Sequence, residues 1–154
     1  MSRAPMHPFL KMMILAAVIL GLYSGLKLLL PYIRFADIKS KVNEAAMNAL
    51  TESDASIAIK LAETALVDKL PIAGDYFFQV KDGQGKVYVL TPETEEQEKE
   101  YTALATAYFT KNITHGADRS ITIAIDYDQD VYFPFNIYKH TIHFHHEESQ
   151  QPPR

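Results

Sequence analysis

Residues 12–26, with the sequence MMILAAVILGLYSGL, form an uncharged stretch near the amino terminus of this 154-residue chain. The apolar character continues past Lys11 and Lys27, so that the run from Phe9 to Leu30 covers 22 residues. As an α-helix this run would rise about 33 Å, enough to cross a hydrocarbon core of about 30 Å. The lysine stems near its ends can carry their ammonium groups into the headgroups. Since apolar residues surround the whole helix, the run is typical of a transmembrane helix and not of a core helix with one apolar stripe.

A cleaved signal peptide is the main alternative interpretation of this start. Arg3 and Lys11 would be its basic beginning, and residues 12–22 its apolar core. However, Leu-Tyr-Ser at residues 22–24 matches the small-residue cleavage pattern poorly, and the apolar run resumes after it. The sequence therefore favours an uncleaved anchor.

The orientation of this anchor follows from two opposing signals. Basic residues flank both sides of the anchor, with Arg3 and Lys11 before it and Lys27, Arg34, Lys39 and Lys41 after it. Counted alone, these charges favour a cytoplasmic carboxyl-terminal domain. The very short amino-terminal tail is instead usual for an anchor that exports the domain behind it. We expect the domain to lie outside the cytoplasm.

Composition bounds what the rest of the chain can do. The first 34 residues carry four basic and no acidic residues, so the remainder holds 11 basic and 19 acidic residues, a net charge of −8. Such a domain is a poor candidate for binding nucleic acid. Cysteine is absent, which excludes disulfides and cysteine zinc sites. We expect the following division: a short tail 1–8, a transmembrane anchor 9–33, a soluble domain 34–146 and a flexible tail 147–154.

Helical periodicity follows the anchor. Ile38, Val42, Ala45 and Ala49 form an apolar stripe that predicts a helix over 34–50, which can continue the anchor without a break. A second helix is expected over 54–70, capped by Ser53 or Asp54. A third is expected over 92–110, because Thr91-Pro92-Glu93 combines a hydroxyl cap, proline at the first helical position and an acid in the first turn.

A period of two marks the strands. Residues 76–80 and 86–90 alternate around Asp-Gly-Gln-Gly and predict a hairpin. Residues 121–127 and 138–144 predict two further strands, with a loop over 112–118 before them. The pattern predicts an α+β fold: a transmembrane helix followed by helices packed on an antiparallel sheet of about four strands.

The histidines and aspartates near the carboxyl terminus are the candidates for chemistry. On a strand, His143 and His145 share one face, while His140 and His146 point to the other. Two imidazoles on one face could hold zinc or copper, but a metal site usually needs three or four convergent ligands, and the sequence places no third. Such histidines are more often exposed polar positions, with His140 a core residue. Asp126, Asp128 and Asp130 imitate the start of a calcium loop, but Val131 and Ile137 stand where that loop needs glycine and glutamate.

Two further clusters are candidates for contacts. Tyr132, Phe133 and Phe135 could form an interaction surface, although closing the end of the sheet is the commoner role for such aromatics. Within the anchor, Gly21, Ser24 and Gly25 form a small-residue pattern that lets two helices approach closely. The sequence has no nucleophile elbow, phosphate loop or dinucleotide fingerprint. We therefore expect no enzymatic activity and no cofactor.

Two segments resemble a bacterial family, domain of unknown function 4845. LKLLLPYIRFADIKSKVNEA at residues 26–45 is similar to its anchor exit, with Pro-Tyr after the apolar run. ITIAIDYDQDVYFPFNIYKHTIHFHHEE at residues 121–148 is similar to its closing pair of strands. The acidic helix expected over 92–110 departs from the pattern. The resemblance implies a small single-pass envelope protein that faces away from the cytoplasm, and it implies no activity.

These observations predict a non-catalytic accessory or assembly subunit of a membrane complex. Its expected partners are membrane lipid and other membrane proteins, or a second copy through the anchor. One alternative is a metal-binding domain that uses His143 and His145. Another is a pilin-like or secretion-system subunit, although residues 6–11 lack the glycine cleavage site and the glutamate of pilin leaders.

Overall fold

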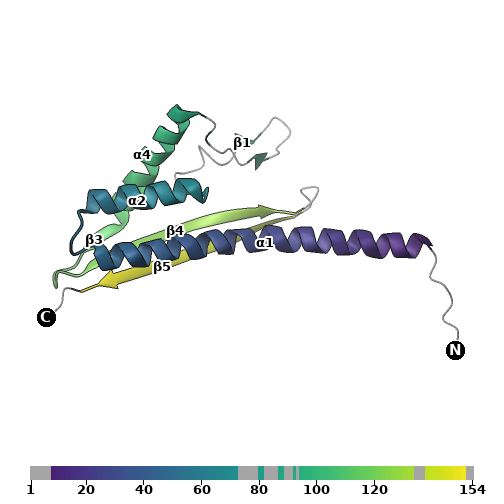
Figure 1. The fold of residues 1–154 in the computed structure, drawn as a ribbon, viewed down its shortest axis with the longest axis horizontal. Helices are drawn as coiled ribbons and strands as arrows, with labels where there is room; N and C mark the ends of the chain where they lie inside the picture. Colours follow the sequence, from purple (N-terminus) through teal and green to yellow (C-terminus); the bar gives the residue numbers. More distant parts are fainter. Residues whose placement is uncertain are drawn as a thin grey trace.

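The computed structural model describes residues 8–72, 80–81, 87–88, 92, 94–133 and 138–151. In these residues the chain folds as α+β, with three helices and a three-stranded antiparallel sheet (Figure 1). The elements in chain order are α1 (Pro8–Asn48), α2 (Asp54–Val67), β1 (Val80–Lys81), β2 (Val87–Tyr88), α4 (Glu95–Asn112), β3 (Ile113–His115), β4 (Ile121–Tyr132) and β5 (Lys139–Gln150).

The longest element, α1, is one continuous helix of 41 residues. It includes Pro31, which is buried and removes one backbone N–H from the helix ladder without ending it. The expected boundary between an anchor and a domain at residue 33 therefore falls inside an unbroken helix. In its second half Ile38, Val42 and Ala46 are fully buried, close to the predicted stripe, with Ala46 in the place expected for Ala45.

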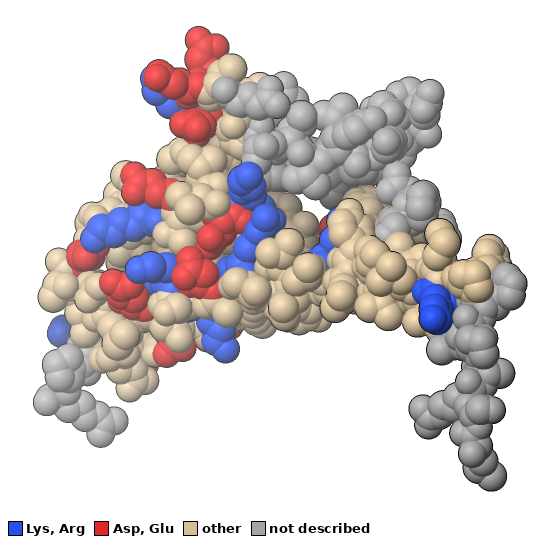
Figure 2. All heavy atoms as spheres, turned by 45° about the vertical axis from the view of Figure 1, so that its right-hand side comes forward, with Lys and Arg blue, Asp and Glu red and all other residues tan. Residues whose placement is uncertain are grey.

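The first half of α1 differs sharply from the second. The best 18-residue window of α1 has a mean hydropathy of 2.1, and none of it is buried. Figure 2 shows this half as a mostly uncharged surface with a basic patch near its amino-terminal end, while most charged side chains gather over the other end of the molecule. By length and composition α1 could span a membrane, as the sequence predicts.

Each of the other two helices begins at a side-chain cap. Ser53 Oγ accepts a hydrogen bond from Ser56 N at 3.3 Å and starts α2, as predicted. The helix ends at Val67 and not at residue 70, since Lys69 adopts a positive φ of 55°. Thr94, whose Oγ1 accepts from Gln97 N at 3.3 Å, starts α4. The predicted start at residue 92 was therefore early.

The main sheet has the order β3-β4-β5 and is antiparallel throughout. β4 and β5 pair over twelve residues each, from Ile121 opposite Gln150 to Tyr132 opposite Lys139. The predicted flexible tail from residue 147 is wrong as far as Gln150, because Glu147 and its successors pair with the start of β4.

Two other expectations about the strands need correction. The loop predicted over 112–118 contains β3, which follows α4 directly and pairs with residues 121–123. The predicted hairpin pairs Val80 with Tyr88 and Lys81 with Val87, and its remaining residues lie outside the described part of the chain. This pair is a separate sheet, so the described strands do not form one sheet of four.

The described part of the chain builds one core from the helices and one face of the sheet. Alternate β4 residues point into it, and the inward residues are Ile121, Ile123, Ile125, Tyr127 and Val131. They meet the buried stripes of α1, α2 and α4, including Leu61, Tyr101 and Phe109. The opposite face of the sheet carries the polar half of each strand. This one-sided packing leaves a long polar surface for function.

Candidate functional site

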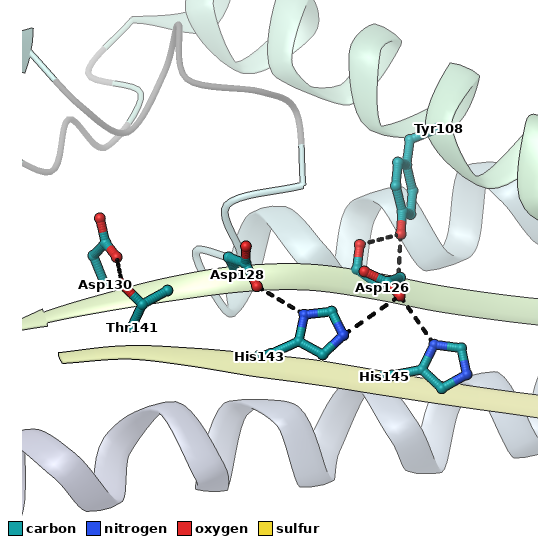
Figure 3. Close-up of polar contacts among 7 residues, drawn as sticks. All are labelled: Tyr108, Asp126, Asp128, Asp130, Thr141, His143 and His145. Atoms are coloured by element: carbon teal, nitrogen blue, oxygen red, sulfur yellow. Dashed lines mark hydrogen bonds and ion pairs between the residues drawn. The ribbon is translucent and has the colours of Figure 1, made fainter.

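The polar face of the β4–β5 hairpin brings together the residues singled out in the sequence. The strand register sets Asp126 opposite His145, Asp128 opposite His143, and Asp130 opposite Thr141. These six side chains, here called the Asp–His ladder, follow one another along the open face (Figure 3). The prediction that His143 and His145 share a face is confirmed, and their aspartate partners come from the neighbouring strand.

His143 lies between two carboxylates. Its Nδ1 is 2.8 Å from Asp128 Oδ1, and its Nε2 is 3.7 Å from Asp126 Oδ2. Asp126 Oδ2 also lies 3.1 Å from His145 Nδ1. The hydrogen bond to Asp128, followed by the charge of Asp126, raises the pKa of His143. Because these groups are exposed to water, their pairing contributes little to the stability of the fold. Its clearer effect is to favour the protonated form of His143.

Asp130 ends the ladder at the far tip of the strands. Its Oδ1 accepts a hydrogen bond from Thr141 Oγ1 at 2.6 Å, and its Oδ2 accepts one from Lys139 Nζ at 3.1 Å. Burial opposes the ionisation of Asp130, but Thr141 and Lys139 outweigh it and lower the pKa of the carboxyl. Asp130 therefore remains charged and neutralises Lys139.

The ladder does not form a metal centre in the described residues. No group of three or more histidine, aspartate or glutamate side chains is arranged there to hold an ion. Each ladder imidazole is instead turned toward an aspartate. The alternative that His143 and His145 bind zinc or copper thus gains no third ligand from the part of the chain that the structure describes.

The other histidines have different surroundings. His146, on the core side as expected, donates from Nε2 to Asn43 Oδ1 at 2.7 Å and so joins β5 to α1. Burial, followed by the charge of Lys39, lowers the pKa of His146. His140 is exposed, so its expected place in the core was wrong. His115 Nε2 lies 2.7 Å from Asp54 Oδ2 and links β3 to α2.

Tyr108 is a member of this site that the sequence did not indicate. Its hydroxyl donates to the backbone oxygen of Asp126 at 2.7 Å and accepts from the backbone N–H of Asp126 at 2.8 Å. β3 pairs with β4 only as far as Ile123. At Asp126 the hydroxyl of Tyr108 therefore takes the place of the missing neighbouring strand (Figure 3). Burial raises the pKa of Tyr108, which keeps the hydroxyl protonated and able to donate.

The end of the hairpin lies against α1. Lys27 Nζ donates to the backbone oxygen of Tyr132 at 3.3 Å. The ring centroids of Phe133 and Tyr138 are 5.7 Å apart, and Phe133 N donates to Tyr138 O at 3.0 Å. We call Tyr132, Phe133, Tyr138 and Lys139 the hairpin tip. Tyr132 and Phe133 are half-buried and Tyr138 is 60% exposed, while Phe135 lies outside the described residues.

A second polar cluster lies inside the domain, after the end of α2. Asp68 Oδ2 and the hydroxyl of Tyr127 are buried and have no hydrogen-bond partner among the described residues. Burial and the neighbouring carboxyl of Asp37 raise the pKa of Asp68 to about 6, against the opposing effect of Arg34. Asp68 thus binds a proton in the folded chain at a pH where an unfolded chain would have lost it.

Asp68→Asn is expected to change the pH dependence of stability. The folded pKa lies above the ordinary 3.8, so the cost of the ionised carboxyl grows as pH rises from about 4 through about 6. At pH 8 the variant should be more stable than the wild type by about 1 kcal/mol, because solvent screens part of the effect at this partly exposed group. At pH 4 the two should unfold alike. Urea unfolding at both pH values checks this, and a difference independent of pH would contradict it.

The small residues of the anchor have an open surface. A Cβ built on Gly21 or Gly25 would meet nothing within 4 Å, counting the described residues. Both glycines are exposed and Ser24 is half-buried. This face of α1 is therefore free to approach another helix.

Comparison of the chain with protein-family models, with curated proteins and with solved structures found no match.

Proposed function

We propose that this chain is a single-pass membrane protein whose helix–sheet domain is a non-catalytic accessory or assembly subunit of a membrane complex. The observation that carries the proposal is the difference in burial between the two halves of α1. Its first half exposes apolar side chains such as Leu15, Ile19 and Leu26, while its second half belongs to the core through Ile38 and Val42. An exposed apolar half-helix is stable in lipid and unfavourable in water.

The continuous helix supports a particular task for the domain. Since α1 passes from the exposed half into the core without a break, the domain has no flexible linker to its anchor. Whatever the domain binds is then held at a set distance from the membrane. A fixed distance suits a subunit that positions other proteins. It would not suit a domain that moves freely on a flexible linker to reach its partners.

We place the domain outside the cytoplasm. The resemblance to the envelope family supports a periplasmic location, while the count of basic residues opposes it.

Fractionation of cells tests the anchor itself. The intact chain should stay with membranes through an alkaline carbonate wash and should dissolve in detergent. The mass of the extracted chain should include the residues before Phe9, which also distinguishes it from a pilin-like subunit with a processed leader. Recovery of the full-length chain in the supernatant without detergent would end the proposal.

Association through the anchor is tested at Gly21 and Gly25. Replacing both with leucine should weaken self-association or partner recovery at least several-fold, because bulky side chains would separate two closely packed helices. A Cβ at either position would meet no other segment of the described chain within 4 Å, so folding should be unchanged. Ala16→Leu, on the opposite side of the helix, is the matched control. Crosslinking in native membranes is the measurement, and equal crosslinking of all three proteins would exclude the glycine face as the contact.

A further inference from the structure

We propose that the hairpin tip lies in the headgroup region of the same membrane that holds α1, so that the protein touches lipid at two places. This inference rests on the proposed transmembrane anchor and adds a second, peripheral contact to it. The partner surface is the lipid interface, and the residues that meet it come from the far end of the β4–β5 hairpin.

The height of the tip follows from its contact with α1. The apolar run from Phe9 to Leu30 covers the thickness of a hydrocarbon core, and Lys27 lies near its carboxyl end. A lysine at that position reaches the headgroup level. Since Lys27 Nζ is bonded to Tyr132 O at 3.3 Å, the tip is at the same level.

The hairpin is held in this position along its length. Ring contacts join α1 to the sheet, with centroids 4.6 Å apart for Phe35 and Phe144 and 5.4 Å apart for Tyr32 and Phe144. Farther from the tip, Asn43 and His146 are hydrogen-bonded. β5 thus runs beside the second half of α1 in the direction away from the anchor (Figure 1). The tip cannot swing away from the membrane without breaking these contacts.

The chemistry of the tip suits the headgroup region. Tyr138 is 60% exposed, and Tyr32, five residues beyond Lys27 on α1, is 51% exposed. Tyrosine is enriched at membrane interfaces because its ring is apolar and its hydroxyl is polar. Water would otherwise solvate the exposed parts of these two side chains.

The charges along β5 also favour an orientation with the tip toward the membrane. Lys139 stands at the tip, whereas Glu147 and Glu148 stand at the opposite end of the strand. Asp130 neutralises Lys139, so the tip presents a balanced pair to anionic lipids, whereas these lipids repel the two glutamates. A domain with its tip toward the membrane therefore has the favourable orientation. An aromatic contact for a protein partner would not need this gradient.

A depth measurement tests the proposal, and the chain suits it because it has no cysteine of its own. His140→Cys places a fluorescent label on an exposed position beside the tip, and Glu147→Cys places one on the same strand about 23 Å farther along. The purified full-length proteins are inserted into phosphatidylcholine–phosphatidylglycerol vesicles that contain lipids with nitroxide headgroups. Strong quenching at position 140 and little at position 147 is the expected result.

A second variant assigns the contact to the aromatic ring. Tyr138→Ser in the His140→Cys background should reduce the quenching at least two-fold, while Tyr138→Phe should retain it. If both labels are unquenched, or quenched equally, in vesicles that keep the protein through a carbonate wash, the tip contact is wrong and the anchor stands. If the protein does not remain with the vesicles, the anchor itself fails. A tip reserved for a protein partner would also leave position 140 unquenched, because no such partner is present.

Discussion

Tyr101→Ala is expected to lower the free energy of unfolding by about 3–5 kcal/mol, the usual cost of removing a large buried aromatic ring. The ring is fully buried on α4, where it faces the core. Its hydroxyl donates to the backbone oxygen of Leu70 at 2.9 Å and so joins α4 to the segment after α2. Burial, followed by the charge of Asp68, raises the pKa of Tyr101, so the hydroxyl is protonated and able to donate at neutral pH.

Two variants separate the ring from its hydroxyl and from general damage to the helix. Tyr101→Phe keeps the ring and should cost about 1 kcal/mol, the usual value of one buried hydrogen bond. Leu104→Ala changes a 41% exposed residue of the same helix and should cost well below the loss for Tyr101→Ala. Urea unfolding in detergent, followed by circular dichroism, measures all three. Equal losses for Tyr101→Ala and Leu104→Ala would show that α4 is not packed as described.

Ile38→Ala is expected to lower the free energy of unfolding by about 2–5 kcal/mol, because Ile38, on the second half of α1, is fully buried in the core. The result is informative because the same helix is otherwise the proposed anchor. Met47→Ala, at a position 64% exposed on this helix, is the matched control and should change stability by about 0.5 kcal/mol or less. If both substitutions are equally mild, the second half of α1 is a stalk beside the domain and not part of its core.

Together these two predictions describe a domain that cannot be separated cleanly from its anchor. The stripe of Ile38, Val42 and Ala46 supplies one wall of the core, and the helix that carries it begins at Pro8. Removing only the apolar run from Phe9 to Leu30 would keep this wall of the core. Removing all of α1 would expose the inner face of β4. A domain boundary placed by hydropathy alone, at the end of the apolar run, therefore falls inside a helix that belongs to the core.

The helices and strands could largely be read from the sequence because their signals are local. A period of four in the second half of α1 and a period of two in β4 each identify the side that is buried. The caps were harder to predict: Ser53 does cap α2, but α4 begins at Glu95 after the cap Thr94, three residues later than predicted. β3 was missed because its three residues are too few to show a period.

In the candidate site, too, the local features could be predicted from the sequence and the contacts between distant segments could not. The alternation of residues 126–130 and 143–145 was sufficient to place the aspartates and the histidines on exposed strand faces. It did not reveal that Asp126 and Asp128 face His145 and His143, because strand register depends on which residues of two distant segments meet. The role of Tyr108 was beyond sequence reasoning as well, since it arises from β3 being too short to cover the edge of β4.

By itself the sequence determined the apolar amino-terminal helix, the α+β class and the polar or apolar side of each long element, because hydrophobicity and its period are properties of neighbouring residues. Only the tertiary structure decided that α1 runs unbroken from the exposed apolar half into the core, that Lys27 meets the backbone of Tyr132, and that Asp68 is crowded by Asp37. These contacts join residues many positions apart or on different elements. Their existence depends on how the helices and the sheet pack, and no local pattern encodes that packing.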